Sequence, residues 1–327
     1  MNSDHVVDGE QAARPYGYLL VHFIDNPVGH GERIYFSLSD GDTPLLWTRM
    51  NHGEPILESR LGTTGVRDPY LVRGDGEFYL IATDLRVVGG DDLGWSEWTR
   101  VASRSLVVWR SEDLVHWSEP WLAEVAPPTA GMAWAPEAMF DPETKIFHVY
   151  WSSHLYSEDD PGHRGDSYSR VLVSGTKDFR SFSAPSVMID RGHSVIDTTL
   201  VHHEGRVHRF SKDDGDLPDS DKVFQEVGSG ITSDDFSIVA RRIADDQFAD
   251  VEGPLIFRDH VTGKWHLWVD QYSVRPQGYI PLVSDDLASG TWTPLADGDF
   301  SLPAGTKHGV VLPLRDGEWD RLASAYL

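Results

Sequence analysis

The chain has 327 residues, of which 52 are acidic and 28 are basic, so its formal net charge is −24 at pH 7. Charge of that sign also serves solubility, but it repels nucleic-acid phosphates and anionic membrane surfaces, so a neutral carbohydrate is a better partner than either. The absence of cysteine excludes disulfides and thiolate metal sites, and 30 glycines with 19 prolines predict many turns between short strands.

The first residues show no sign of a leader or a membrane span. The N-terminal sequence MNSDHVVDGEQAARPYGYLL lacks a basic start followed by an apolar core, and no apolar stretch approaches membrane-spanning length. We therefore expect a cytoplasmic protein, or a secreted one if a leader precedes this sequence. Residues 1–13 are expected to form a disordered tail, followed by a single domain over residues 14–327.

Strand signals begin at Ser37, where SLSDGDTPLLW places a Ser/Asp turn before a strand that holds an aromatic residue. This half-pattern recurs as SEDLVHW at Ser111, GTKDFRSF at Gly175, TSDDFSI at Thr232 and VSDDLASGTW at Val283. Such recurrence is typical of a repeat architecture, in which each copy is one small supersecondary unit.

A second half-pattern begins at Arg67 and consists of an acid or glycine, a short apolar strand, a turn and an aromatic-rich strand. Its copies are RDPYLVRGDGEFYLIATD from Arg67, PEAMFDPETKIFHVYWSS from Pro136, IDTTLVHHEGRVHRFSK from Ile196, EGPLIFRDHVTGKWHLWVD from Glu252 and HGVVLPLRDGEWDRLASAY from His308. The turns carry Asp-Gly, Glu-Gly or Thr-Gly-Lys, which favour hairpins. The strands alternate or run apolar, as strands in stacked sheets do.

The order of the two half-patterns predicts how the chain closes. Four complete units run from about residue 66 to 300, whereas the fifth has its first half at the C-terminus and its second half at the N-terminus. A β-sandwich gives no reason for this circular order, but a propeller whose last blade is shared by both ends does. The sequence therefore predicts an all-β, five-bladed β-propeller, with inserts at 86–104, 154–170 and 213–223 around its central pocket.

Acidic residues recur near the start of the first strand in four of the units, and His308 takes that place in the fifth. The four acids are Asp68, Glu137, Asp197 and Glu252. Any one of them alone would be explained well enough by turn chemistry, since Asp-Pro and Glu-Gly-Pro favour turns. Together, at blade spacing, they should converge on one axis, where carboxylates raise each other's pKa and suit metal binding or acid–base chemistry.

Five short motifs at these positions, taken in order, resemble those of glycoside hydrolase family 43. They are Gly-Val-Arg-Asp-Pro at 65–69, Trp-Ala-Pro-Glu at 134–137, Val-Ile-Asp-Thr-Thr at 195–199, Val-Glu-Gly-Pro at 251–254 and Lys-His-Gly-Val-Val-Leu-Pro at 307–313. The resemblance runs from about residue 16 to the end of the chain. It implies hydrolysis with inversion, for which two carboxyl groups stand roughly 6.5–9.5 Å apart.

By this resemblance Asp68 is the general base and Glu252 the general acid. Asp197 corresponds to the residue that raises the pKa of the acid and orients it. Thr198 follows Asp197 where the family commonly has proline, which leaves the local turn open.

Three other residues could be mistaken for catalytic or metal-binding groups. Asp25, in the sequence DNP, is rejected as the base because no apolar strand with a glycine turn follows it. Glu137 corresponds to a position that family members use for substrate contact or support rather than proton transfer. His163, in EDDPGHRGD, is interpreted as a surface-loop residue rather than a metal ligand.

Sugar contacts are expected first from Trp134, because an aromatic ring suits the apolar face of a sugar. His22, Arg67 and Arg275 are candidates for hydroxyl contacts, although a structural role suits each of them equally. The family places the residue that matches His308 beneath the sugar, where it can hold a calcium ion through water on the axis, and oxygen ligands suit Ca²⁺ better than Zn²⁺. No phosphate loop or dinucleotide motif is present, so no cofactor is expected to be required.

The segment 155–185, together with GERIYFSLSDG at 31–41, resembles the branch of exo-acting arabinofuranosidases. We therefore expect an inverting α-L-arabinofuranosidase that releases terminal arabinofuranose from arabinan-type oligosaccharides or polysaccharides. A galactofuranosidase or a β-xylosidase on the same scaffold stays open, as does a carbohydrate-binding propeller without catalysis, although a pure binder needs no base, acid and modulator together. A sialidase-type propeller fits less well, because it needs an arginine trio for an anionic substrate.

Overall fold

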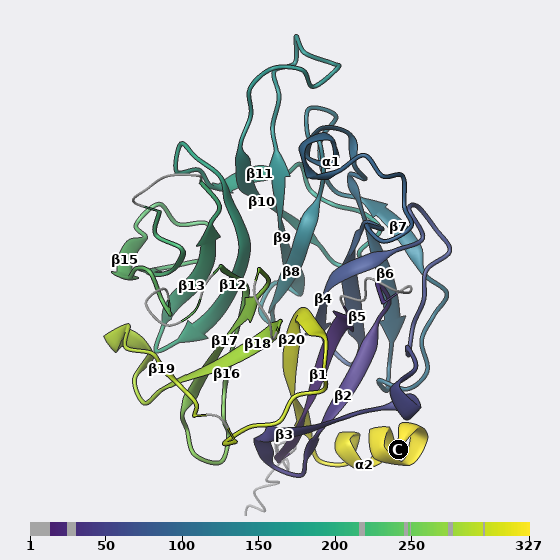
Figure 1. Cartoon of the computed structure of the whole chain (residues 1–327), viewed down its shortest axis with the longest axis vertical. Coiled ribbons are helices and arrows are strands. Elements are labelled where there is room, and N and C mark those ends of the chain that lie inside the picture. The colour runs from purple at the N-terminus through teal and green to yellow at the C-terminus, as the bar shows by residue number, and fades with distance from the viewer. Residues whose placement is uncertain are drawn as a thin grey trace, which may run out of the picture.

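The computed structural model describes residues 14–24, 31–215, 220–244, 248, 250–273, 277–296 and 298–327. These residues form five four-stranded antiparallel sheets arranged as blades around an axis, so the predicted five-bladed β-propeller is confirmed (Figure 1). The tail predicted for residues 1–13 lies outside the described residues, as does part of the third insert.

Each blade begins with an inner strand next to the axis and continues outward from it. Blade one contains β4 (Val66–Arg73), β5 (Phe78–Asp84), β6 (Ser105–Ser111) and β7 (Trp121–Glu124), and blade two contains β8 (Trp134–Asp141), β9 (Ile146–His154), β10 (Ser169–Thr176) and β11 (Ser186–Ile189). Blade three contains β12 (Val195–His203), β13 (Arg206–Asp213), β14 (Val223–Gly228) and β15 (Ser237–Ala240), and blade four contains β16 (Val251–Arg258), β17 (Trp265–Gln271), β18 (Gly278–Ser284) and β19 (Thr293–Pro294). Blade five contains β20 (Thr306–Arg315), β1 (Pro15–Ile24), β2 (Tyr35–Asp40) and β3 (Thr43–Arg49).

Blade five joins the two ends of the described chain. The inner strand β20 pairs antiparallel with β1, from Thr306 opposite Ile24 to Arg315 opposite Pro15, and the two strands lie side by side in Figure 1. The five inner strands contact one another in a closed ring around the axis. Neither β20 nor β1 is therefore an open edge, as the circular order of the sequence pattern predicts.

The hydrophobic core consists of five clusters, one between each pair of neighbouring blades. Successive side chains of a strand point to opposite faces of its sheet, so every blade contributes to two clusters. In β5, for example, Leu80 and Ala82 pack against blade five, whereas Tyr79 and Ile81 pack against blade two. This division explains why the second strands β5, β9, β13 and β17 are buried along nearly their whole length rather than at alternate residues.

The C-terminal segment differs from its prediction. The sequence pattern predicts that the residues after β20 continue as a turn and a second strand, but they form the helix α2 (Glu318–Tyr326). β1 already occupies the place next to β20, so no second strand is needed there. The helix instead buries Leu322 in the cluster between blades five and one.

Helices are few among the described residues. Besides α2 there are the helix α1 (Trp95–Val101) in the first insert and two short 3-10 turns, at Asn51–Gly53 and Leu287–Ser289. None of the helices in the described ranges combines the length and the apolar character needed to cross a bilayer.

Candidate active site

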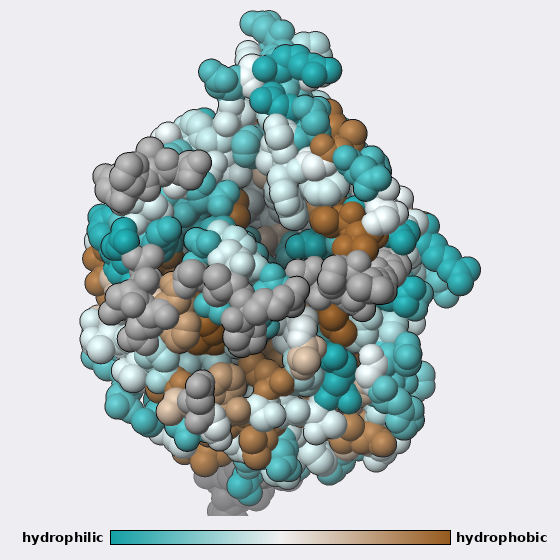
Figure 2. Space-filling model, in the orientation of Figure 1, coloured by the Kyte–Doolittle hydropathy of each residue, from teal (hydrophilic) through white to brown (hydrophobic). Residues whose placement is uncertain are grey.

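A bulge near the start of each inner strand positions the acidic side chains. In four strands two residues oppose one on the neighbouring strand. The first bulged residue has a left-handed backbone in Asp68 (φ 49°), Ala135 (φ 46°), Asp197 (φ 51°) and Gly253 (φ 52°). In β20 the register shift leaves His308 as the extra residue. Because a bulge re-aims side chains, these residues leave the sheet pattern and meet at one end of the axis. The space-filling view in Figure 2 shows the molecule hollowed near the axis.

The register also shows that the four acids do not hold equivalent positions. Asp68 and Asp197 are the first bulged residues of their strands, and Thr198 occupies the place that proline takes after Asp68. Glu252 precedes its bulge, whereas Glu137 follows the bulge of β8. The four acids are spaced about one blade apart in the sequence, so the sequence alone does not reveal these shifts of one or two residues.

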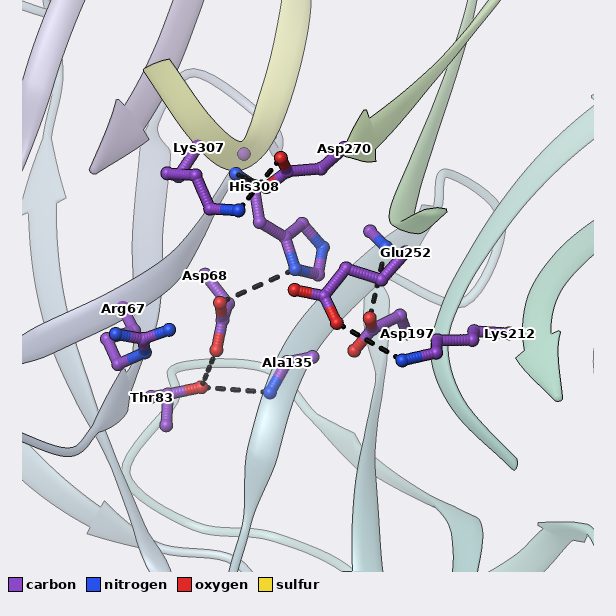
Figure 3. Close-up of polar contacts among 12 residues, drawn as sticks. Arg67, Asp68, Thr83, Ala135, Asp197, Lys212, Glu252, Asp270, Lys307 and His308 are labelled. Carbon is purple, nitrogen blue, oxygen red and sulfur yellow. Dashed lines mark hydrogen bonds and ion pairs between the residues drawn. The ribbon is translucent and has the colours of Figure 1, made fainter. Parts of the chain in front are cut away.

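Asp68 and His308 form an ion pair at the centre of the site, with 3.4 Å between Oδ1 and Nδ1 (Figure 3). Burial raises the pKa of Asp68, but the hydrogen bond and charge of His308, together with Arg67 and the Thr83 hydroxyl, lower it below its usual value. Burial likewise opposes the charge of His308, yet the carboxylates around it raise the pKa of this imidazole to about 10. The pair is therefore carboxylate and imidazolium at neutral pH.

Thr83 on β5 fixes the second oxygen of Asp68. Its hydroxyl donates to Asp68 Oδ2 over 2.9 Å and accepts from the backbone N–H of Ala135 over 2.8 Å. The N–H of Ala135 leaves the hydroxyl only one direction in which to donate, so Thr83 holds Asp68 in a defined orientation.

Asp197, Glu252 and Lys212 form the opposite side of the site (Figure 3). Asp197 Oδ2 accepts from the backbone N–H of Gly253 over 3.0 Å, and Lys212 Nζ lies 3.2 Å from Glu252 Oε2. Burial and the charge of Glu252 raise the pKa of Asp197 to about 7, although His308 and Lys212 oppose this. The buried Asp197 and the partly exposed Glu252 thus lie beside one ammonium group.

Glu137 lies deeper than the other acids. It is 4% exposed, and its Oε2 accepts from the hydroxyl of Tyr150 over 2.9 Å. Burial raises the pKa of Glu137 to about 8, against the lowering effects of Tyr150 and His308. So little exposed surface suits support of the site from below better than direct contact with a sugar.

The other predicted contact residues lie in different surroundings. Trp134 begins β8 at the same end of the axis as Asp68, and it is partly exposed. Arg67 binds Glu32 over 2.9 Å, with its guanidinium 4.6 Å from the centre of the Phe23 ring. Arg275 lies outside the described residues, as does Asp25.

His22 does not fit its predicted contact with a sugar hydroxyl. It is completely buried in β1, where Nδ1 bonds the carbonyl of Phe23 over 3.0 Å and Nε2 bonds Ser37 Oγ over 3.1 Å. Burial and the charge of Arg49 lower the pKa of His22 to about 3, so the ring is neutral and part of the core.

Sequence reasoning missed a second layer of charged and polar groups around the acids. Lys212 also binds Asp214 Oδ1 over 3.0 Å and lies 3.5 Å from the hydroxyl of Tyr272. Asp270 accepts from Lys307 Nζ over 2.9 Å and from the backbone N–H of His308 over 3.1 Å. Lys212 is one of several charged residues in β13, so the sequence alone does not single it out, and its role becomes clear only once the strand pairing is known.

The expected axial calcium finds no ligand set among the described side chains. They contain no group of three His, Asp or Glu residues that could hold a metal ion. The described residues therefore supply no direct set of side-chain ligands for calcium, and a calcium ion held through water by His308 stays a prediction.

The chain is similar to known proteins in sequence and, separately, in structure. Residues 14–320 match a family related to glycoside hydrolase family 43 and described as a "probable glycosyl hydrolase domain". An α-L-arabinofuranosidase of Bifidobacterium longum subsp. longum is 31% identical over 213 residues, which are 61% of this chain. The match spans only 20% of that relative's length.

Solved structures show the same fold at low sequence identity. The catalytic domain of a family 62 α-L-arabinofuranosidase from Coprinopsis cinerea is 16% identical, with a TM-score of 0.50. An α-L-arabinofuranosidase from Podospora anserina, solved in complex with cellotriose, is 14% identical with the same TM-score. Each similarity covers 77% of this chain and 74% of the other.

Proposed function

Since the chain belongs to the family of glycosyl hydrolase domains related to glycoside hydrolase family 43, we propose that it is an exo-acting α-L-arabinofuranosidase. It releases terminal arabinofuranose, with inversion, from arabinan-type oligosaccharides or polysaccharides. The observation that carries the proposal is the convergence of Asp68, Asp197 and Glu252 from three blades on one end of the axis. The likeness to an arabinofuranosidase of Bifidobacterium longum supports the choice of sugar.

Asp68 acts as the general base in the proposed reaction. It takes a proton from the water that attacks the anomeric carbon, so it must be ionised beforehand. Its lowered pKa meets that need, and the partners on its two oxygens, His308 and Thr83, keep the carboxylate oriented. After transfer the proton on Asp68 returns to solvent, and the enzyme is ready for another cycle once Glu252 has taken a proton from solvent.

Glu252 acts as the general acid and gives its proton to the glycosidic oxygen as the bond to the anomeric carbon breaks. Lys212, 3.2 Å from Oε2, stabilises the carboxylate that this transfer leaves behind. Asp197 binds the N–H of Gly253 and so fixes the backbone that carries Glu252. One proton thus leaves the water and one enters the leaving group, which balances the reaction.

The proposed reaction needs no cofactor, because both proton transfers are made by side chains of this chain. Dialysis of the protein against a chelator should therefore leave turnover unchanged. A loss of activity that added calcium restores would contradict this part of the proposal.

A panel of nitrophenyl glycosides, read beside sugar release from arabinan, tests the proposal. We expect α-L-arabinofuranoside to be the preferred substrate, and proton NMR of the first product to show the anomer opposite to that of the substrate. Preference for a galactofuranoside or a xyloside would change the sugar that we assign to the enzyme but not the proposed mechanism. Binding of arabinan without release of any sugar would contradict the enzymatic proposal itself.

A further inference from the structure

One tryptophan beside the site is exposed. All 12 tryptophans of the chain lie within the described ranges, and 11 of them are buried or partly buried. Trp95, the first residue of α1, is 54% exposed. A single exposed aromatic residue is ordinary on a protein surface, so its meaning depends on where it lies and how it is held.

Trp95 lies at the end of the propeller that carries the acids. Its ring centre is 5.8 Å from that of Trp134, and the two rings meet edge to face. Trp134 is the first residue of the inner strand β8. Val66, two residues before Asp68, is the first residue of the inner strand β4, so Trp134 and Asp68 lie near the same ends of their strands. The guanidinium of Arg67 lies 5.7 Å from the centre of the Trp95 ring. Trp95 therefore stands beside the opening of the site, one ring farther out than Trp134.

The support beneath Trp95 holds the indole in place. Trp98 packs against it edge to face with 5.2 Å between ring centres, and the buried Trp98 donates from Nε1 to Asp91 over 2.8 Å. The second insert supports the helix from the other side, where Arg100 donates to the carbonyl of His163 over 2.6 Å. A ring held in this way loses little freedom on binding a ligand.

The same contacts connect the two inserts. The ring of His163 stacks on Tyr156 with 4.5 Å between centres and binds the carbonyl of Arg100 over 2.6 Å. Gly131 lies so close to the backbone of α1 that a Cβ there would be 2.1 Å from the carbonyl oxygen of Thr99. His163 is thus a structural residue of this junction.

The position of Trp95 determines which sugar it can reach. The terminal sugar must lie within hydrogen-bonding reach of Asp68 and Glu252, at the starts of the inner strands, where Trp134 is its aromatic neighbour. Trp95 is 54% exposed whereas Trp134 is only partly exposed, so Trp95 is the aromatic ring that the next unit of a chain would meet. We infer that Trp95 is a stacking platform for the sugar unit to which the terminal residue is attached.

The charges around Trp95 agree with a neutral sugar. Glu32 binds Arg67 over 2.9 Å, and the chain as a whole carries a net charge of −24, so an anionic ring would be repelled. The face of an indole suits the C–H face of a neutral sugar ring. The platform rests on the proposed function, since it is defined relative to the bond that Asp68 and Glu252 cleave.

The test compares two substrates that share the terminal sugar and differ in what leaves. Trp95→Ala should lower kcat/KM for arabinotriose on the order of tenfold, mainly through KM, because the leaving sugar loses its stacking partner. Hydrolysis of methyl α-L-arabinofuranoside, whose leaving group has no ring, should fall far less, because there Trp95 acts only through its contact with Trp134. Trp95→Phe should restore most of the loss, and Val101→Ala, which trims another exposed apolar residue of α1, should have no effect.

Equal losses on both substrates, or no loss on arabinotriose, would overturn the platform. Calorimetric titration of arabinotriose into the Glu252→Gln protein, with and without Trp95→Ala, separates this inference from the proposed function. If the wild type hydrolyses neither substrate, the proposed function fails while the titration still decides the platform. Unchanged affinity after Trp95→Ala, or no binding in either protein, would count against it.

Discussion

Asp68 is ionised because of its neighbours, and among them the hydroxyl of Thr83 can be removed with the least change in side-chain shape. The hydroxyl of Thr83 is among the groups that lower the pKa of Asp68. Thr83→Val keeps the shape of the side chain but leaves Asp68 without this donor and Ala135 without its acceptor. We expect kcat to fall roughly tenfold.

The pH profile tells a role of Thr83 in positioning and charging Asp68 from a merely structural one. Loss of the hydroxyl raises the pKa of Asp68, so the acid limb of the kcat/KM profile should move to higher pH. Thr83→Ser, which keeps the hydroxyl, is the matched control and should keep the wild-type limb. An acid limb that does not move in Thr83→Val would show that Thr83 has no effect on the base.

The raised pKa of Glu137 predicts how the free energy of unfolding depends on pH. Its pKa is about 8 in the folded protein, against an ordinary value of 4.5. Below 4.5 both the folded and the unfolded states hold the proton, and between 4.5 and about 8 only the folded state does. The free energy of unfolding should therefore fall as pH rises through this range, and it should level off above the folded pKa.

Glu137→Gln removes this titration and keeps an oxygen that can accept from Tyr150. The variant should match the wild type near pH 4 and exceed its free energy of unfolding by a few kcal/mol near pH 8, on the order that linkage predicts. Urea unfolding at several pH values measures the difference. A constant difference between the two proteins across that range would mean that Glu137 ionises normally in the folded state.

The sequence predicted the acids better than it predicted their partners. Asp68, Asp197 and Glu252 stand in short motifs, in which Asp68 precedes proline and Glu252 precedes glycine, so they can be recognised without a structure. Thr83 and Lys212 come from second strands of their blades, and their roles depend on register across a bulge. Fifteen residues separate Thr83 from Asp68, and no local pattern indicates that they pair.

At the scale of elements, α2 shows where strand periodicity fails as a guide. EWDRLASAY carries apolar residues that fit either a strand or a helix, and which one forms depends on whether the place beside β20 is free. β1 occupies that place, so the segment folds as a helix instead. Its ends are held by the ion pair of Arg73 with Glu318 and by the hydroxyl of Tyr326, which donates to the carbonyl of Val115.

Leu322 tests how firmly α2 is attached. It is completely buried between blades five and one, so Leu322→Ala should cost about 2–5 kcal/mol of unfolding free energy. Leu327→Ala, at the exposed end of the same helix, should stay within about 0.5 kcal/mol of the wild type. Chemical denaturation measures both. A cost below about 1 kcal/mol for Leu322→Ala would mean that the helix contributes little to the core.

At the scale of the whole molecule, the closure of blade five holds the site together, because His308 lies on β20 and Asp68 on the neighbouring β4. The circular order of half-patterns predicted this closure, since it requires only that repeats be recognised and counted. If the closure is as stable as the other blades, amides of β1 and β20 should exchange with solvent as slowly as those of β4 and β5. Early exchange confined to blade five would show that the ring opens there first.

The central claim is that Asp68 and Glu252 hydrolyse a glycoside as base and acid, and the leaving-group dependence of Glu252→Gln tests it most directly. The variant should fold as the wild type does and should lose roughly 10²–10⁴-fold in turnover on arabino-oligosaccharides, whose leaving oxygen needs a proton. On a dinitrophenyl glycoside, whose leaving group needs no proton, it should keep most of its activity. Near-normal hydrolysis of arabino-oligosaccharides by Glu252→Gln, or equal losses on both substrates, would contradict the account.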